Sequence, residues 1–242
     1  MGRASARPLT RREKVERKEK ALLSAARALF LERGYDGVRT ADLAKRVQIS
    51  EGSIYSYFKN KSELMQGVVV DFWREIAEGA HAAIAAGDPP MEQLHDLAVY
   101  HLATVIDNFD FLDLTFSLRR AGEDIIVSRD DVRTYTSVFD EIMNRAIDRG
   151  DLASGTVIWL VRDTFYGTLE YSARTILGRS TKSSTDMNLV VDNLLEQIRR
   201  MYGANAQSQV NSQSPNEAIT QRLERIAETF EVTIEQFKRQ NS

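Results

Sequence analysis

Helix-breaking residues are scarce in this chain, and apolar residues recur between them at three- and four-residue steps. Only 4 of the 242 residues are proline and 13 are glycine, too few to separate many short strands. Apolar residues with this spacing form one stripe along a helix. No stretch shows the two-residue alternation of apolar and polar residues that is typical of a half-buried strand. We therefore expect an all-α protein.

The composition excludes several classes of protein. With 43% apolar and 28% charged residues, it is typical of a globular chain. No apolar run approaches the roughly 20 residues that cross a bilayer, and none follows a basic N-terminus as in a signal peptide. We expect a cytoplasmic protein that does not contact membranes. Because the chain has no cysteine, disulfides, zinc ribbons and thiol nucleophiles are excluded.

Charge is distributed unevenly along the chain. Residues 1–66 carry 15 Lys and Arg against 8 Asp and Glu, a net charge of +7, whereas the remainder carries 17 against 27, a net charge of −10. A basic segment is the natural place to seek a polyanionic partner. Residues 1–17 are interpreted as a flexible basic arm, which either stays solvated or lies along a nucleic acid.

Four helical patterns follow this arm. The first ends near Gly34, a residue suited to the end of a helix. Thr40, Ser50 and Asn60 would then cap the next three helices. Residues 48–50 alone separate the second and third helices, which is the spacing of a helix-turn-helix. The free face of the third helix would carry Glu51, Gly52, Ser53, Ser56 and Tyr57.

Three motifs run through this segment. They are Ala25-Ala26-x-x-Leu29-Phe30-x-x-x-Gly34, Thr40-x-x-Leu43-Ala44, and Ile49-Ser50-x-Gly52-Ser53-Ile54-Tyr55-x-Tyr57-Phe58-x-Asn60-Lys61-x-x-Leu64. Together they resemble the DNA-binding domain of the TetR family of bacterial transcriptional regulators, over about residues 18–70. The family usually has glycine in the turn where this chain has Gln48, so we expect Gln48 to adopt a left-handed conformation at some cost.

The resemblance implies two kinds of contact with double-stranded DNA. Phosphate contacts, which fix the position of the protein on the duplex, would come from Thr40, Tyr55, Tyr57 and Lys61. Base edges would face Glu51, Gly52, Ser53 and Ser56. We also assign Arg39, Ser50 and Lys59 to the interface. Glu51 would either accept a hydrogen bond from a cytosine amino group or complement the dipole of the third helix.

The remaining helices fall into a larger second part, residues 71–202, with breaks at residues 87–90, 121–122, 150 and 178–184. One apolar stripe runs from Leu94 through His101 to Phe109. The resemblance implies that this part binds an effector and forms a dimer, with the last two long helices of each subunit making a four-helix bundle. Residues 203–215 read as a linker. Residues 216–240 read as an appended amphipathic helix, which either folds back on its domain or binds another chain.

Aromatic side chains in the second part would line an apolar pocket or simply pack in the core. With the nearby cations, the candidate effector-binding residues are Phe109, Phe116, Arg120, Tyr135, Phe139, Trp159, Arg162 and Tyr166. Residues 165–177 are loosely similar to the fatty-acid-responsive branch of the family, whose effectors are acyl-CoA thioesters. A multidrug or aromatic effector is an equal alternative. His101 lies on an apolar stripe and is interpreted as a core residue.

An enzyme function finds little support in the sequence. The three histidines lack the spacing of a metal pair, and there is no glycine-rich phosphate loop, so we predict no catalytic residue, cofactor or metal site. We predict a homodimeric repressor that binds a palindromic operator and is released by a small apolar or amphipathic effector. The alternative is a helical ligand-binding or scaffold protein without sequence-specific DNA binding.

Overall fold

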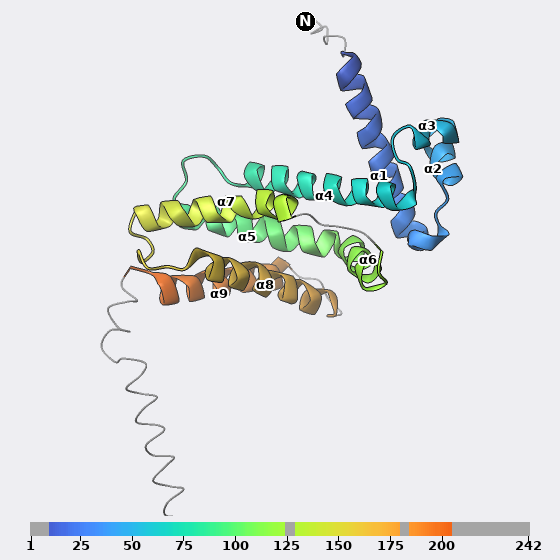
Figure 1. The fold of residues 1–242 in the computed structure, drawn as a ribbon. Coiled ribbons are helices and arrows are strands. Elements are labelled where there is room, and N and C mark those ends of the chain that lie inside the picture. The colour runs from blue at the N-terminus through green and yellow to red at the C-terminus, as the bar shows by residue number, and fades with distance from the viewer. Residues whose placement is uncertain (1–9, 124–128, 180–183, 205–242) are drawn as a thin grey trace, which may run out of the picture.

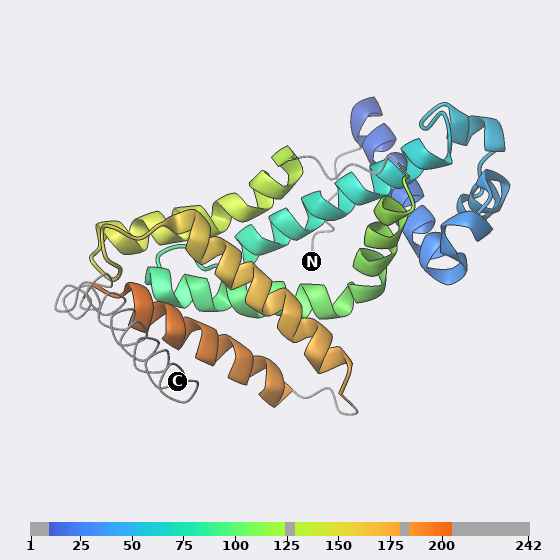
Figure 2. The ribbon, with the colours of Figure 1, turned by 60° about the horizontal axis from the view of Figure 1, so that its bottom comes forward.

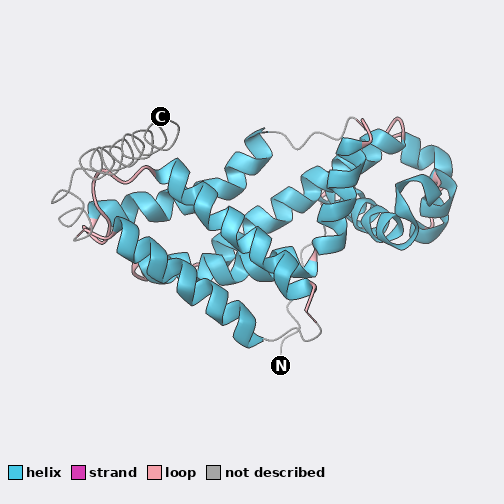
Figure 3. Ribbon diagram, turned by 90° about the horizontal axis from the view of Figure 1, so that it is seen from below, coloured by secondary structure: helices cyan, strands magenta, loops and turns pink. Residues whose placement is uncertain are grey.

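The computed structural model describes residues 10–123, 129–179 and 184–204, and Figure 3 shows that they are helical almost throughout. The helices are α1 (Arg11–Gly37), α2 (Thr40–Val47), α3 (Glu51–Tyr55), α4 (Lys61–Ala83), α5 (Pro90–Asp107), α6 (Phe109–Arg120), α7 (Arg129–Asp148), α8 (Ile158–Leu177) and α9 (Ser184–Tyr202). No strand occurs within these ranges, so the all-α prediction is confirmed. The appended helix and most of the linker lie outside the described residues.

The helices form a lobe and a bundle. Figure 1 shows α1, α2 and α3 gathered at one end, with α4 running from them into a bundle with α5, α7, α8 and α9. Helix α6 packs against α1 and α5, and α8 and α9 pack on α5, as the view in Figure 2 shows. Within the described ranges, no helix has both the length and the apolar character needed to cross a bilayer.

Helix α1 begins earlier than the sequence analysis assumed. Residues 11–17, assigned there to a flexible arm, are helical. The reason is a capping box: Thr10 Oγ1 accepts from the Glu13 N–H, and the Glu13 carboxylate accepts from the Thr10 N–H at 2.6 Å. The helix breaks at Gly34, with φ 70° and ψ 167°, a conformation that favours glycine. The expected end of the first helix is therefore confirmed.

The stripe from residue 94 to residue 109 predicted one helix, but the structure divides it at Asn108. The Asn108 Nδ2 donates to the Thr104 carbonyl at 2.8 Å, and its Oδ1 accepts from the Arg27 guanidinium. The side-chain amide thus bonds the end of α5 while the chain turns into α6. Neither glycine nor proline marks this break, so the apolar pattern alone could not reveal it. The four breaks that the sequence did predict coincide with junctions between helices, although Pro90 and Ser184 are already the first residues of α5 and α9.

The turn between α2 and α3 has the predicted conformation. Gln48 has φ 56° and ψ 45°, which places it in the left-handed region, and its N–H bonds the Lys45 carbonyl. Buried Ile54 and Phe58 then seat α3 in the lobe core. A Cβ on Gly67 of α4 would lie 2.8 Å from the Phe58 ring, so glycine at this position lets the ring pack closely against α4.

Candidate nucleic-acid interface and ligand cavity

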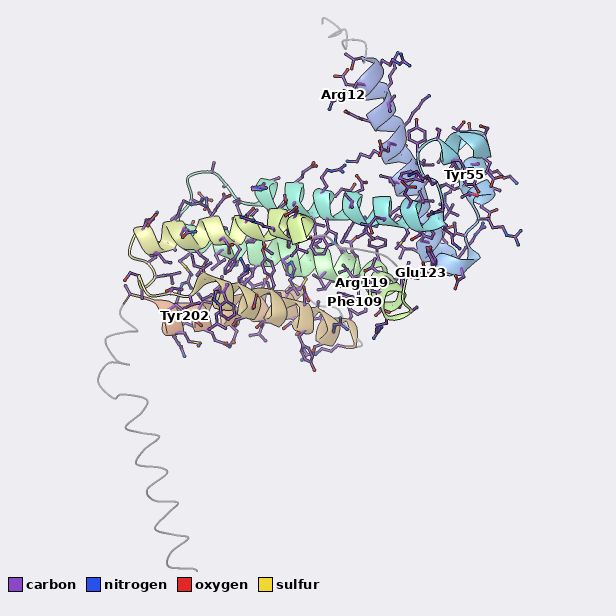
Figure 4. The ribbon with its side chains drawn as sticks, in the orientation of Figure 1. Arg12, Tyr55, Phe109, Arg119, Glu123 and Tyr202 are labelled. Atoms are coloured by element: carbon purple, nitrogen blue, oxygen red, sulfur yellow. The ribbon has the colours of Figure 1, made fainter. Side chains whose placement is uncertain are left out.

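The outward face of α3 is small and polar. Ser50 caps the helix by accepting from the Ser53 N–H at 3.1 Å, as predicted. Gly52 is exposed, and a Cβ there would meet nothing within 4 Å. The Tyr55 side chain is 50% exposed, and Figure 4 shows it at the opposite end of the molecule from Tyr202. This face is therefore accessible to a partner.

Thr40 joins α2 to α3 rather than capping α2. The helix begins at Thr40 itself, so the N-cap position falls on Arg39, which makes no side-chain capping bond. Thr40 Oγ1 donates to Glu51 Oε1 at 2.6 Å and lies 3.1 Å from Tyr55 Oη. The predicted cap is wrong by one residue, and the hydroxyl instead fixes the two helices relative to each other.

The basic residues of the interface differ in their freedom. The Lys61 ammonium donates to the Tyr35 carbonyl at 3.1 Å and lies 4.5 Å from the centre of the Tyr35 ring. It therefore ties α4 to the end of α1, although an ammonium group has further donors for a phosphate. Arg39 and Lys59 are exposed, whereas Tyr57 is half-buried.

A cavity of about 760 Å³ lies between α4, α5, α6, α7 and α8. Small-molecule sites commonly have volumes of roughly 300 to 1,000 Å³. Phe72 and Trp73 of α4 and Phe111 of α6 provide much of its apolar wall. The candidate effector residues that line it are Phe116, Tyr135, Arg162 and Tyr166.

The other four candidate effector residues lie elsewhere. Arg120 lines a second cavity of about 550 Å³ together with Phe116, Arg119 and Arg174, and Phe109 lies beneath the Arg174 guanidinium. Phe139 is fully buried against Phe165 and Tyr166. Trp159 is 58% exposed on α8.

Sequence analysis missed the residues that α4 gives to the cavity. Neither Phe72 nor Trp73 is among the candidate effector residues, which all lie within residues 109–166. Because α4 passes from the lobe into the bundle, its aromatic residues are shared between the two parts. A useful signal would have been the pair of adjacent aromatic residues, since neighbours on a helix point in different directions.

One wall of the cavity is polar and largely neutral. His101 Nδ1 and Tyr135 Oη are 2.6 Å apart, and the rings of His101 and Tyr166 meet edge to face at 4.8 Å. Burial lowers the pKa of His101 to about 3 and raises the pKa of both tyrosines. These three groups are therefore uncharged near neutral pH. Beside them, Arg162 Nη1 and Asp140 Oδ2 form an ion pair at 2.6 Å.

Arg27 of α1 connects the lobe to the cavity wall. Its guanidinium lies 4.6 Å from the ring centres of both Phe72 and Phe111. It also bonds the Asn108 side chain and lies 3.5 Å from Glu75. Desolvation lowers the pKa of Arg27, and the nearby carboxylates oppose that shift. A contact between Tyr35 Oη and Glu123 Oε2 at 3.4 Å forms a second link, in the region where Figure 4 shows Glu123 beside α6.

The two-part architecture agrees with known proteins. Residues 22–68 match the sequence model for bacterial regulatory proteins of the tetR family. A transcriptional regulator of the TetR/AcrR family from Thermobifida fusca has the same fold, with a TM-score of 0.58 and 24% sequence identity. The matched region covers 76% of this chain and 97% of that one. Residues 22–68 form a tetR-family domain. As predicted, the relatives of the chain are regulators rather than enzymes.

The relatives of this chain include a regulator of fatty acid metabolism. The fatty acid metabolism regulator protein of Bacillus subtilis (strain 168) is 22% identical over 156 residues, which cover 64% of this chain and 80% of that protein. A structure of the transcriptional regulator FadR from Bacillus subtilis in complex with stearoyl-CoA has a TM-score of 0.57 and 19% identity, covering 74% and 96% of the two chains. Other curated relatives match over less than half of their own length. At these identities the structural likeness establishes the fold.

The buried His101 should make stability depend on pH. Its pKa falls from an ordinary value of 6.5 to about 3 on folding, so acidification protonates the unfolded state first. Stability should therefore be lost as the pH falls through 6.5 toward 3, by about 2 kcal/mol between pH 7 and pH 5 from this group. Urea unfolding at the two pH values measures the loss. His101→Gln should remove this part of the pH dependence, whereas the control His81→Gln, at an exposed site, should not. If the free energy of unfolding changes equally with pH in both variants, the assignment to His101 is contradicted.

Proposed function

We propose that this regulator is a ligand-responsive, homodimeric repressor. Two copies of α3 would read the half-sites of a palindromic operator, and an effector in the larger cavity would change their spacing. The observation that carries this proposal is the position of Arg27, a lobe residue seated on two rings of the cavity wall. Because its partner would be chromosomal DNA, the proposed location is the cytoplasm.

The lobe has the side chains that DNA binding requires. Glycine and serine on the face of α3 permit close approach to base edges, and Arg39 and Lys59 are exposed beside it. The first turns of α1 add an exposed basic surface, formed by Arg11, Arg12, Lys14, Arg17 and Lys18. Residues 1–17 would thus approach the phosphates partly as a helix.

Helices α8 and α9 carry the proposed dimer interface. The exposed apolar residues on these helices are Trp159, Leu160, Tyr171, Leu189 and Met201. Exposed apolar side chains gathered on two adjacent helices are typical of a surface that another chain covers. Their arrangement supports an intersubunit four-helix bundle.

The effector we propose is amphipathic, with an anionic head group. The larger cavity has an apolar wall for its body, and the adjoining cavity brings together Arg119, Arg120 and Arg174 against a single carboxylate, Asp113. Figure 4 shows Arg119 on α6, near the junction with the lobe. Acyl-CoA thioesters fit this chemistry, and a related fold has been observed with stearoyl-CoA.

Coupling between effector and operator would pass through Arg27. A ligand shifts an equilibrium only when it binds one conformation better than the other. A molecule that displaced Phe72 or Phe111 would also displace the guanidinium stacked on them. Since Arg27 belongs to α1, the lobe would change its orientation with the cavity wall.

DNA binding should respond differently to changes at phosphate and base contacts. Lys59→Gln should weaken binding to all sequences and reduce the salt slope by about one. Gly52→Ala adds a methyl group that meets no protein atom within 4 Å, so folding should persist while specific binding loses roughly 1 to 3 kcal/mol. Fluorescence anisotropy at several salt concentrations measures both effects, with Arg200→Gln on α9 as a control. The absence of any sequence preference in the unaltered protein would favour the scaffold alternative.

Dimerisation should depend on the exposed apolar residues of α8 and α9. Tyr171 and Leu189 are 74% and 65% exposed, so the double variant Tyr171→Arg, Leu189→Arg should fold normally but sediment as a monomer. Leu31→Arg, at a residue of α1 that is 44% exposed, should sediment like the unaltered chain. A dimer that survives the double substitution would place the interface elsewhere.

Loss of the planar guanidinium at Arg27 should uncouple the two sites. Arg27→Lys retains the charge but not the planar group that packs on the rings. Stearoyl-CoA should therefore still raise the melting temperature, while the ratio of operator affinities without and with this ligand, the allosteric factor, should fall toward one. Allosteric factors are commonly about 5- to 150-fold. Arg33→Gln, also on α1, removes an exposed ion pair with Asp42 and should leave the factor unchanged. An undiminished factor in Arg27→Lys would exclude this route.

A further inference from the structure

We propose that the effector carries, besides its anionic head, a neutral hydroxyl group that binds the polar wall of the larger cavity. This inference rests on the proposed function. It begins from three buried polar atoms that have no hydrogen-bond partner among the described residues: His101 Nε2, Asp140 Oδ1 and Tyr166 Oη. All three residues line the same cavity.

The three atoms come from three different helices. His101 belongs to α5, Asp140 to α7 and Tyr166 to α8, and the His101 and Tyr166 side chains are only 5% and 9% exposed. Buried polar atoms normally have partners, because leaving one unpaired is unfavourable. Three such atoms beside one cavity therefore indicate a ligand that supplies the missing bonds.

Their chemistry defines the missing group. Tyr135 Oη lies 2.6 Å from His101 Nδ1. When the Tyr135 hydroxyl donates to that nitrogen, its proton is no longer available to a ligand. The neutral imidazole then carries its proton on Nε2 and offers a donor to the cavity. Tyr166 Oη can donate or accept, whereas Asp140 Oδ1 only accepts. A ligand hydroxyl can accept from His101 or Tyr166 and donate to Asp140.

Other groups fit this wall less well. A methyl group would leave all three atoms unpaired. A ketone could accept from His101 or Tyr166 but could not donate to Asp140. A carboxylate would bring a second negative charge to Asp140, whose own charge is already paired with Arg162. A hydroxyl is therefore favoured over each of these.

The spacing along α8 places the hydroxyl relative to the anionic head. Arg162, Tyr166 and Glu170 line the larger cavity, and Arg174, one helical turn further, lines the smaller one. The eight residues from Tyr166 to Arg174 span about 12 Å along the helix. The ligand class is thus an apolar molecule with an anionic group near Arg174 and a hydroxyl about 12 Å away along the helix axis.

Matched ligands test this inference on the full chain. The probes are decanoate, dodecanoate, tetradecanoate and hexadecanoate, each beside its ω-hydroxy and ω-carboxy derivative, because an extended chain of about ten carbons separates its two ends by roughly the 12 Å measured along the helix. Calorimetry should show the ω-hydroxy member binding about tenfold tighter than the plain member at the best chain length. The ω-carboxy member should bind more weakly than the ω-hydroxy member.

Variants on α8 identify the hydroxyl-binding wall. Tyr166→Phe removes an unpartnered hydroxyl, so it should fold and lose the preference for the ω-hydroxy member. Tyr202→Phe, at a tyrosine of α9 that lines neither cavity, should keep the preference. In contrast, Tyr135→Phe removes a hydrogen-bonded hydroxyl and should lower the melting temperature.

Two outcomes would overturn the inference. One is equal or tighter binding of the plain member at every chain length, and the other is the absence of any binding within the series. Operator binding, measured separately, decides the proposed regulatory function. Specific operator binding together with either outcome would reject the hydroxylated ligand alone, whereas loss of operator binding would reject the proposed function.

Discussion

The packing of the Arg27 guanidinium over the adjoining rings of Phe72 and Phe111 is the interaction on which the arrangement of the two parts depends. A partly buried guanidinium is stable only when its charge and its donors find partners. Asn108 and Glu75 supply them, and Asn108 is also the residue at which α5 gives way to α6. One buried cation thus fixes the lobe, the start of α6 and two rings of the cavity wall together.

Helix α4 makes the lobe and the bundle mechanically continuous. The boundary that the sequence suggested between residues 70 and 71 falls inside this helix. Leu64 and Val68 belong to the core beside the lobe, whereas Phe72, Trp73 and Ile76 line the cavity. A helix transmits displacement along its length, so a change at the cavity and a change in the lobe cannot be wholly independent.

The DNA-facing surface could be predicted from sequence far better than the cavity. The cap at Ser50, the turn at Gln48 and the exposed face of α3 all arise within one short, contiguous segment. The cavity is assembled from five helices distant in sequence. Four of its predicted residues line it, but Phe139 is buried and Trp159 is exposed on the outside. The sequence around an aromatic residue does not reveal whether its side chain lines the cavity, packs in the core or lies on the outer surface.

The sequence by itself determined the helical fold, most helix boundaries and the tetR-family character of residues 22–68, because caps, turns and apolar periodicity act over a few neighbouring residues. Tertiary structure alone decided that Asn108 ends a helix, that Lys61 binds Tyr35, and that Arg27 reaches the cavity. It also left three buried polar atoms without partners in residues of α5, α7 and α8 that line one cavity. Such features depend on which side chains remain uncovered once the helices pack, and that is not a property of any one segment.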